Sequence, residues 1–138
     1  MARISDNQAL QRAIDLALFD RDSYTHACKD NPDELAQTRA EIESIKALRG
    51  VKISALSKEQ QKHAYAAFVF AEQWEESLSY GNPDAGVRKG CLANVRLFRS
   101  VRHRRWGQSK YEQLLANAKP VNLIDIVNEG IEAASRKS

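Results

Sequence analysis

The chain has little of the residues that break helices or cross-link a fold. Among its 138 residues are only three prolines and six glycines, too few for a protein built from many tight turns. The two cysteines, Cys28 and Cys91, fall among helically spaced apolar residues, so we expect buried free thiols rather than a disulfide. No apolar run approaches the ~20 residues of a membrane-spanning helix, and the N-terminal segment lacks the apolar core of a secretory signal. We therefore expect a protein of a reducing cytoplasm that does not enter a membrane.

Length and composition are those of one soluble globular domain. A chain of 138 residues is long enough to bury a core of its own. Hydrophobic residues make up 43% of it and charged residues 28%, which are ordinary values for such a domain. Composition alone indicates no particular ligand.

Signals that begin and end helices divide the first part of the chain. Ser5 with Gln8 forms a capping box, which predicts a helix from about residue 6 to residue 30. The run Asn31-Pro32-Asp33-Glu34 predicts a second helix, because Asn caps, Pro suits the first turn and acids face the positive helix end. Gly50 ends that helix. Since the connector has only a few residues, we expect residues 1–50 to form an antiparallel helical hairpin.

A third helix is predicted between Ser57, which forms a capping box with Gln60, and Gly81. Its middle, AYAAFVFAEQW, is apolar almost all round and is typical of the central helix of a bundle. Residues 51–53 are the only strand-like run in the chain, and three residues do not make a sheet.

Three further helices follow. The fourth is predicted from residues 82–84 to Gly107, and a short fifth from a capping box of Ser109 and Glu112. A last helix begins at Asn122. The sequence therefore predicts an all-α fold, a single-domain bundle of about six helices over residues 1–138. Residues 1–50 form its helical hairpin, and residues 57–135 form the remaining bundle with a basic helix.

One stretch of 27 residues, Ala85 to Tyr111, contains no acidic residue. It carries eight of the 21 Lys and Arg residues, so the net charge of +3 separates into +8 in this window and −5 elsewhere. Segregated charge of this kind attracts a polyanion. The candidate nucleic-acid-binding residues are Arg88, Lys89, Arg96, Arg99, Arg102, His103, Arg104, Arg105 and Lys110.

On a helical wheel the fourth helix has an apolar and a cationic side. We expect the apolar side to face the core; it consists of Val87, Cys91, Val95, Phe98 and Val101. The opposite side is a cationic ridge roughly 22 Å long at ~1.5 Å per residue; it consists of Arg88, Lys89, Arg96, Arg99 and His103. Arg102 and Arg105 point toward the apolar side. Either their stems reach outward there, or the helix has left the core by that point.

Three interpretations of the cationic ridge remain open. Six of the eight cations in the window are Arg, and a guanidinium group can donate two parallel hydrogen bonds to the oxygens of one phosphate. This favours a nucleic-acid backbone as the ligand. The second interpretation is an acidic protein surface. In the third, the ridge is a solvated face that pairs with acids of the preceding helix. Glu72, Glu75 and Glu76 are the candidates, although three acids cannot balance eight cations.

Two aromatic residues and two glycines accompany the basic run. A base can stack on Trp106 or Tyr111, at roughly 1–3 kcal/mol per base in known single-strand binders; alternatively, Trp106 completes the bottom of the core. Gly86 and Gly90 each cost up to ~1 kcal/mol in a helix interior. Either the helix begins near Lys89, or the glycines allow another backbone or a phosphate to come close.

No set of residues has the spacing that catalysis or metal binding needs. His26, His63 and His103 are scattered along the chain, and Glu59 with His63 is a single i,i+4 pair without a second pair of ligands. No glycine-rich phosphate loop, nucleophile elbow or deaminase signature occurs. We expect a non-enzymatic protein without a metal or a cofactor.

The C-terminal part of the chain resembles a known family. From Ala85 the sequence reads AGVRKGCLANVRLFRSVRHRR, and Leu114-Leu115-Ala116 and Lys119-Pro120-Val121 follow. This stretch of about 50 residues resembles the small helical subunit of type I CRISPR surveillance complexes. The resemblance implies an all-α, non-catalytic subunit for antiviral defence that associates with itself along an RNA-guided complex. Basic residues of such a subunit would stabilise the guide and the displaced target strand.

The sequence thus predicts a non-catalytic, cytoplasmic helical protein that binds a nucleic-acid backbone independently of base sequence, within a larger ribonucleoprotein. The alternative is an adaptor or a phage-type inhibitor that docks an acidic partner surface through the basic helix. We also expect self-association, because the third helix is apolar on nearly every side and the first two helices carry narrow apolar stripes.

Overall fold

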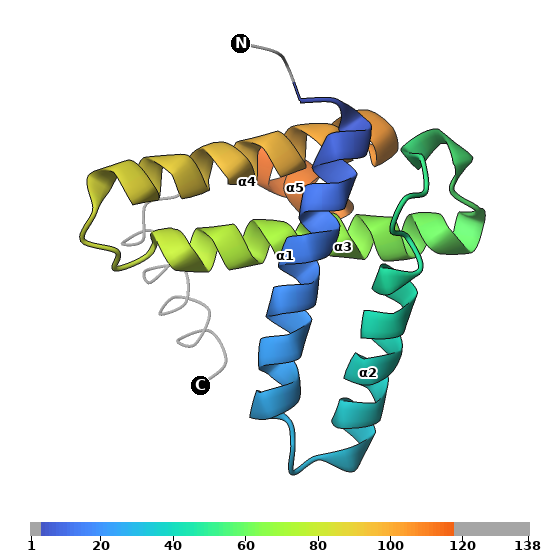
Figure 1. Ribbon diagram of the computed structural model, residues 1–138. Coiled ribbons are helices and arrows are strands. Elements are labelled where there is room, and N and C mark those ends of the chain that lie inside the picture. Colours follow the sequence, from blue (N-terminus) through green and yellow to red (C-terminus); the bar gives the residue numbers. More distant parts are fainter. Residues whose placement is uncertain (1–3, 118–138) are drawn as a thin grey trace, which may run out of the picture. The chain divides into compact units, whose positions relative to one another are not determined.

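Helices make up most of the part of the chain that the structure describes. The computed structural model describes residues 4–117, except the side chains of residues 111 and 115–117. This part contains five α-helices and one short 3-10 helix, and no β-strand (Figure 1). The prediction of an all-α fold is confirmed, and five of the about six predicted helices lie in this range. The sixth helix, predicted from Asn122, lies outside the described residues.

The chain divides into two compact units, Met1–Gly107 and Gln108–Ser138. The first unit contains α1 (Asp6–Ala27), α2 (Pro32–Lys46), the short helix η1 (Ile53–Ala55), α3 (Lys58–Ser79) and α4 (Ala85–Trp106). The second unit contains α5 (Lys110–Asn117). The single domain expected over residues 1–138 stays a prediction.

The helices begin and end where local chemistry places them. Ser5 and Ser57 each form a complete capping box with the Gln three residues on. Asn31 caps α2 by accepting a hydrogen bond from the Glu34 N–H at 3.2 Å. Asp84 caps α4, because its Oδ1 accepts from the N–H groups of residues 86 and 87 at 2.8 and 3.2 Å. Gly81 and Gly107 follow the ends of α3 and α4 as predicted, with positive φ of 71° and 74°. The prediction for Gly50 (φ 75°) is less accurate, because α2 ends at Lys46 with Ala47 as its C-cap.

In the first unit two helical hairpins share one core. α1 and α2 run antiparallel, as predicted, and α3 and α4 form a second antiparallel pair, which α1 crosses (Figure 1). α3 packs against α1, α2 and α4, as expected of a central helix, and α1 also packs against the other three. The largest fully buried side chains of this core are Phe68, Phe98, Leu10, Ile14, Ile45, Leu48 and Val101.

The contact between α1 and α3 is lined by small side chains. Three alanines on one face of α1 and three on one face of α3 all have 0% exposure; they are Ala9, Ala13, Ala17, Ala64, Ala67 and Ala71. Because side-chain size at the contact sets the distance between two packed helices, these alanines let the two helices come close. Between α3 and α4, by contrast, aromatic rings fill the space, with the ring centroids of Phe68 and Phe98 6.2 Å apart.

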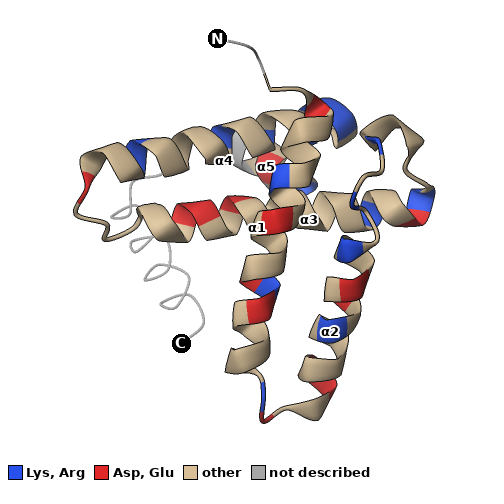
Figure 2. Cartoon of the chain, in the orientation of Figure 1, with Lys and Arg blue, Asp and Glu red and all other residues tan. Residues whose placement is uncertain are grey.

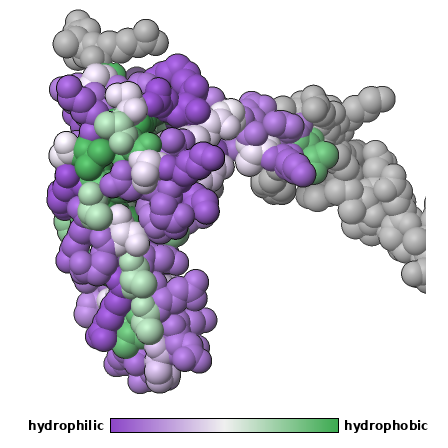
Figure 3. All heavy atoms as spheres, turned by 90° about the vertical axis from the view of Figure 1, so that its right-hand side faces the viewer, coloured by the Kyte–Doolittle hydropathy of each residue, from purple (hydrophilic) through white to green (hydrophobic). Residues whose placement is uncertain are grey.

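The surface of the first unit is mostly polar. Viewed from the side of α2 and η1, hydrophobic residues form only a narrow strip between hydrophilic ones (Figure 3). The exposed hydrophobic side chains include Phe19 at 63% and Tyr80 at 72% exposure. None of the helices between residues 4 and 117 combines the length and apolar character needed to cross a bilayer. Cys28 and Cys91 are buried and unpaired, as predicted.

Candidate nucleic-acid interface

α4 turns one side to the core and the other to solvent. Val95, Phe98 and Val101 on the core side are 4%, 1% and 0% exposed, and Cys91 is 8% exposed. The expectation that Val87 also faces the core is wrong, because this residue is 44% exposed. Val87 lies in the first turn of α4, and α1 crosses the hairpin of α3 and α4 away from that end (Figure 1).

The exposed side of α4 carries a line of cations narrower than the predicted ridge. Lys89, Arg96 and Arg99 follow one line along the helix, with Leu92 between the first two. We call Lys89, Arg96 and Arg99 the cationic stripe. His103, half-buried, continues this line toward the helix end. Figure 2 shows basic residues along α4 and acidic residues on the part of α3 beside it.

Two members of the cationic stripe have no acidic partner among the residues that the structure describes. Lys89 and Arg96 are exposed and form no ion pair within residues 4–117. The Nε of Arg96 donates to the carbonyl oxygen of Leu92, in the same helix, at 3.3 Å. Their charge therefore remains available to an anion in solution.

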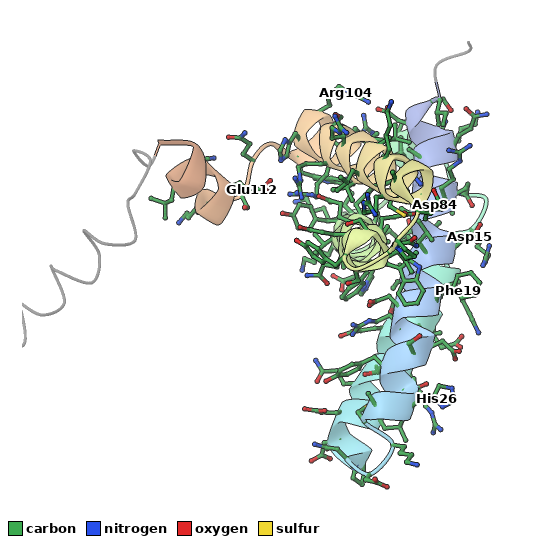
Figure 4. The ribbon with its side chains drawn as sticks, turned by 90° about the vertical axis from the view of Figure 1, so that its left-hand side faces the viewer. Asp15, Phe19, His26, Asp84, Arg104 and Glu112 are labelled. Carbon is green, nitrogen blue, oxygen red and sulfur yellow. The ribbon has the colours of Figure 1, made fainter. Side chains whose placement is uncertain are left out.

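Other predicted cations lie outside the stripe. Arg88 donates to the carbonyl oxygen of Asn82 just before α4. Arg104, near the end of the helix (Figure 4), pairs with Asp6 of α1, with Nη2 and Oδ1 2.9 Å apart. Arg105 is exposed, so its side chain reaches outward, but the helix has not left the core there, because Trp106 still packs against it. Lys110 is exposed at the start of α5, in the second unit.

Arg102 is buried, which corrects its prediction as a nucleic-acid contact. The residue is 5% exposed. Its Nε and Nη2 donate to the two carboxylate oxygens of Glu72 at 2.8 and 3.0 Å, and its Nη1 donates to the Tyr65 hydroxyl at 3.3 Å. Neither expectation for this position is correct: the side chain does not reach outward, and the helix has not yet left the core. The pair with Glu72 satisfies a charge that would otherwise be costly to bury.

Glu72 also binds a residue of the stripe. The Nε of Arg99 donates to Glu72 Oε1 at 3.0 Å. The Glu72 side chain is 5% exposed, the Arg102 side chain 7% and the Arg99 side chain 45%. One buried carboxylate of α3 therefore binds two guanidinium groups of α4, one buried and one that reaches solvent.

The other acids of α3 do not neutralise the basic helix. Glu75 Oε1 accepts from the Asn94 amide at 3.2 Å, and Glu76 accepts from the Tyr80 hydroxyl at 3.0 Å. Neither forms an ion pair among the described residues. Of the three candidate counter-ions, the pairing interpretation is confirmed for Glu72 alone.

Cys91 extends the polar contact between α3 and α4 toward the start of α4. Burial raises the pKa of the Cys91 thiol, and so do its hydrogen bond to Glu75 and the negative charge of that carboxylate. The thiol is therefore held in its protonated form, which is a poor nucleophile. This geometry assigns Cys91 to packing rather than to chemistry.

Trp106 packs against the core. Its ring lies edge-on to Tyr65, with centroids 5.7 Å apart, and 5.8 Å from the centroid of Phe68. Its indole N–H donates to Gln61 Oε1 at 3.4 Å. These contacts match the alternative in which Trp106 completes the core rather than stacking on a base. The side chain of Tyr111 lies outside the described residues.

Of the explanations for the two glycines, a helix that begins near Lys89 is wrong, no close approach of a second backbone is found among the described residues, and the close approach of a phosphate stays a prediction. α4 begins at Ala85, so both Gly86 and Gly90 lie inside it. A Cβ on Gly90 would meet no atom within 4 Å, and the nearest atom to a Cβ on Gly86 is Asp84 Oδ1 at 3.2 Å. No second backbone of the described chain approaches α4 at this point.

The histidines and acids do not assemble into a metal site in the part of the chain that the structure covers. Glu59 and His63 on α3 lie 3.6 Å apart, from Oε1 to Nε2, and no group of three His, Cys, Asp or Glu residues that could hold a metal ion occurs among the described residues.

Comparison with known proteins identifies no relative. The chain has no significant match to a protein-family model, to a curated protein or to a solved structure.

Proposed function

We propose that the cationic stripe of α4 binds the backbone of a nucleic acid independently of base sequence, as part of a ribonucleoprotein of the RNA-guided type. One observation carries the proposal. Lys89 and Arg96 are exposed on one line of a single helix without an acidic partner within residues 4–117, and Arg99 reaches solvent beside them. Like charges on one helix face repel unless an anion lies between them.

The length of the cationic stripe suits a phosphate backbone. The ten residue steps from Lys89 to Arg99 span about 15 Å at ~1.5 Å per residue, and successive phosphates on one strand of a duplex are spaced by about 3.4 Å of axis. Three contacts of this kind give a log–log salt slope of about −2 for a single strand and about −3 for a duplex. The proposed affinity is thus modest and strongly dependent on salt.

The kind of assembly follows from the sequence resemblance. The segment that begins at Ala85 resembles the small helical subunit of RNA-guided complexes, and α4, which carries the cationic stripe, begins at that residue. A stripe of only three cations supports a role beside other nucleic-acid-binding subunits, because avidity then adds to a weak individual contact. In this role the protein is non-catalytic.

Fluorescence anisotropy with labelled single-stranded and duplex oligonucleotides, over a range of salt concentrations, tests the proposal. Arg96→Gln is expected to weaken binding equally for all base sequences and to flatten the salt slope by about one unit. Arg39→Gln is the matched control, because Arg39 is an exposed arginine on α2 and its loss changes the net charge equally.

Two results would contradict the proposal. A salt slope near zero for the unmodified protein excludes phosphate contacts. Equal losses for the Arg96 and Arg39 variants show that net charge rather than α4 is responsible. Binding to poly-glutamate but not to oligonucleotides would instead support the alternative of an adaptor that docks an acidic partner.

A further inference from the structure

Arg99 differs from the other two residues of the cationic stripe because one edge of its guanidinium group is fixed. Its Nε donates to Glu72 Oε1 at 3.0 Å, and Glu72 is buried whereas the Arg99 side chain is 45% exposed. The two terminal amino groups of Arg99 form no hydrogen bond within the described part of the chain. The guanidinium group is thus held at its inner edge and open at its outer edge.

We infer that Arg99 is the residue of the stripe that recognises a phosphate group through two parallel hydrogen bonds, and that Glu72 positions it to do so. This inference rests on the proposed function. A guanidinium group is planar and carries its donors in a rigid fork, so fixing the Nε edge also fixes the direction of the Nη1 and Nη2 donors. A side chain already held in its binding orientation loses less conformational entropy when a ligand arrives.

Glu72, which holds Arg99, is itself held in place by Arg102. Arg102 binds both of its carboxylate oxygens, at 2.8 and 3.0 Å, from a position that is 7% exposed. Glu72 is therefore held on both oxygens and does not swing toward the surface. The chain of contacts runs from Arg102 to Glu72 to Arg99, and only its last member reaches solvent.

Neither of the other residues of the stripe has such support. Arg96 is exposed, and its Nε contacts only the carbonyl oxygen of Leu92 in its own helix, at 3.3 Å. Lys89 carries a compact charge on a flexible stem and cannot present a planar fork. These two residues supply charge, whereas Arg99 supplies charge and a fixed direction.

Removing Glu72 can either tighten or weaken oligonucleotide binding, and the direction depends on the role of this residue. A carboxylate beside a polyanion site repels the ligand, so removing Glu72 for electrostatic reasons alone would tighten binding. If Glu72 positions Arg99, removing it weakens binding although the site becomes more positive. The direction of the change therefore separates positioning from charge.

The test compares lysine substitutions that keep the charge and remove the fork. We expect Arg99→Lys to weaken binding of a single-stranded oligonucleotide about tenfold at low salt, with the salt slope unchanged, and Arg96→Lys to change it by less than about twofold. Glu72→Gln is expected to weaken the same binding severalfold. Circular dichroism melts establish that each variant is folded at the temperature of the titration.

The outcomes distinguish this inference from the proposed function. If the unmodified protein binds with a salt slope but Arg99→Lys and Arg96→Lys behave alike, Arg99 is an ordinary cation and the inference is wrong. Tighter binding by Glu72→Gln overturns it as well. If Glu72→Gln does not fold, Arg99→Lys still tests the inference. The Arg99 side chain is half-exposed, so its replacement by lysine is expected to leave the fold intact. An unmodified protein that binds no oligonucleotide overturns the proposed function, and the inference with it.

Discussion

Replacing Arg102 by alanine tests whether this residue stabilises the core or binds a ligand at the surface. The substitution removes the hydrogen bonds of Arg102 to Glu72 and Tyr65, and it leaves the buried carboxylate of Glu72 with Arg99 as its remaining arginine partner. Breaking a buried ion pair by removing one partner costs about 3–5 kcal/mol. Because Arg99 still reaches Glu72, we expect the lower end of this range, about 3 kcal/mol.

Urea denaturation and thermal melts, both followed by circular dichroism, measure this loss. For a domain of this size, about 3 kcal/mol corresponds to a fall of roughly 10 °C in Tm. Well below that temperature, oligonucleotide binding is expected to weaken less than in Glu72→Gln, because Arg102 lies in the core and Arg99 keeps its own hydrogen bond to Glu72. Arg96→Ala is expected to show the reverse, with weakened binding and a change in stability under ~0.5 kcal/mol.

A combined variant tests the physical reason. Glu72→Leu with Arg102→Met removes both charges, and apolar side chains in place of a buried ion pair are often neutral or stabilising by about 1–4 kcal/mol. The double variant is expected to recover most of the stability that Arg102→Ala loses. If Arg102→Ala melts like the unmodified protein and loses as much binding as Arg96→Ala, the assignment of Arg102 to the core is refuted.

Three further substitutions have defined outcomes. Phe98→Ala, at a position that is 1% exposed, is expected to lower the free energy of unfolding by about 3–5 kcal/mol in urea denaturation; a loss under ~1 kcal/mol would contradict its place in the core. Gly90→Ala is expected to raise stability by up to ~1 kcal/mol in thermal melts, since its Cβ meets no atom within 4 Å, and a destabilised variant would show that something does contact this side of α4. For Cys91 the pKa of the thiol is raised in the fold, so its contribution is present at neutral pH and is lost as pH rises through the raised pKa. Urea midpoints should therefore fall from neutral to strongly alkaline pH, and they should fall less in Cys91→Ala; equal slopes for the two proteins would contradict this.

The parts of the fold that depend on near neighbours in the chain were predictable. The caps at Ser5, Asn31 and Ser57 require only a side chain and a backbone N–H three residues on. The core side of α4 at Val95, Phe98 and Val101 follows from the helical period. Each of these features is fixed within one helix or at its end.

Positions that depend on a neighbouring helix were not predictable in the same way. A helical wheel gives the direction of a side chain but not what lies opposite it, so Val87 and Arg102 were both misplaced. Val87 lies in the first turn of α4 and is 44% exposed, whereas Arg102 meets Glu72, 30 residues earlier, across the contact of α3 and α4. That meeting depends on how far the two helices are shifted along each other.

Tyr65 and Asn94 were missed altogether. Tyr65 contacts Arg102, and Asn94 donates to Glu75. Each had a signal in the sequence. Asn94 lies on the apolar side of α4, between Cys91 and Phe98, and Tyr65 lies two helical turns before Glu72 on the same side of α3. A polar group on an apolar helix side generally has a partner across the contact.

The alanines at the crossing of α1 and α3 determine what a mutational scan of this protein can detect. Alanine scanning measures the loss of side-chain atoms, and six residues of this contact, all with 0% exposure, have almost nothing to lose. Such a scan would rank the crossing as unimportant. Enlargement gives the opposite result, because extra methylene groups in a close-packed site cost typically 1–3 kcal/mol. A scan to leucine at Ala13 or Ala67 would therefore reveal a constraint on sequence that truncation cannot show.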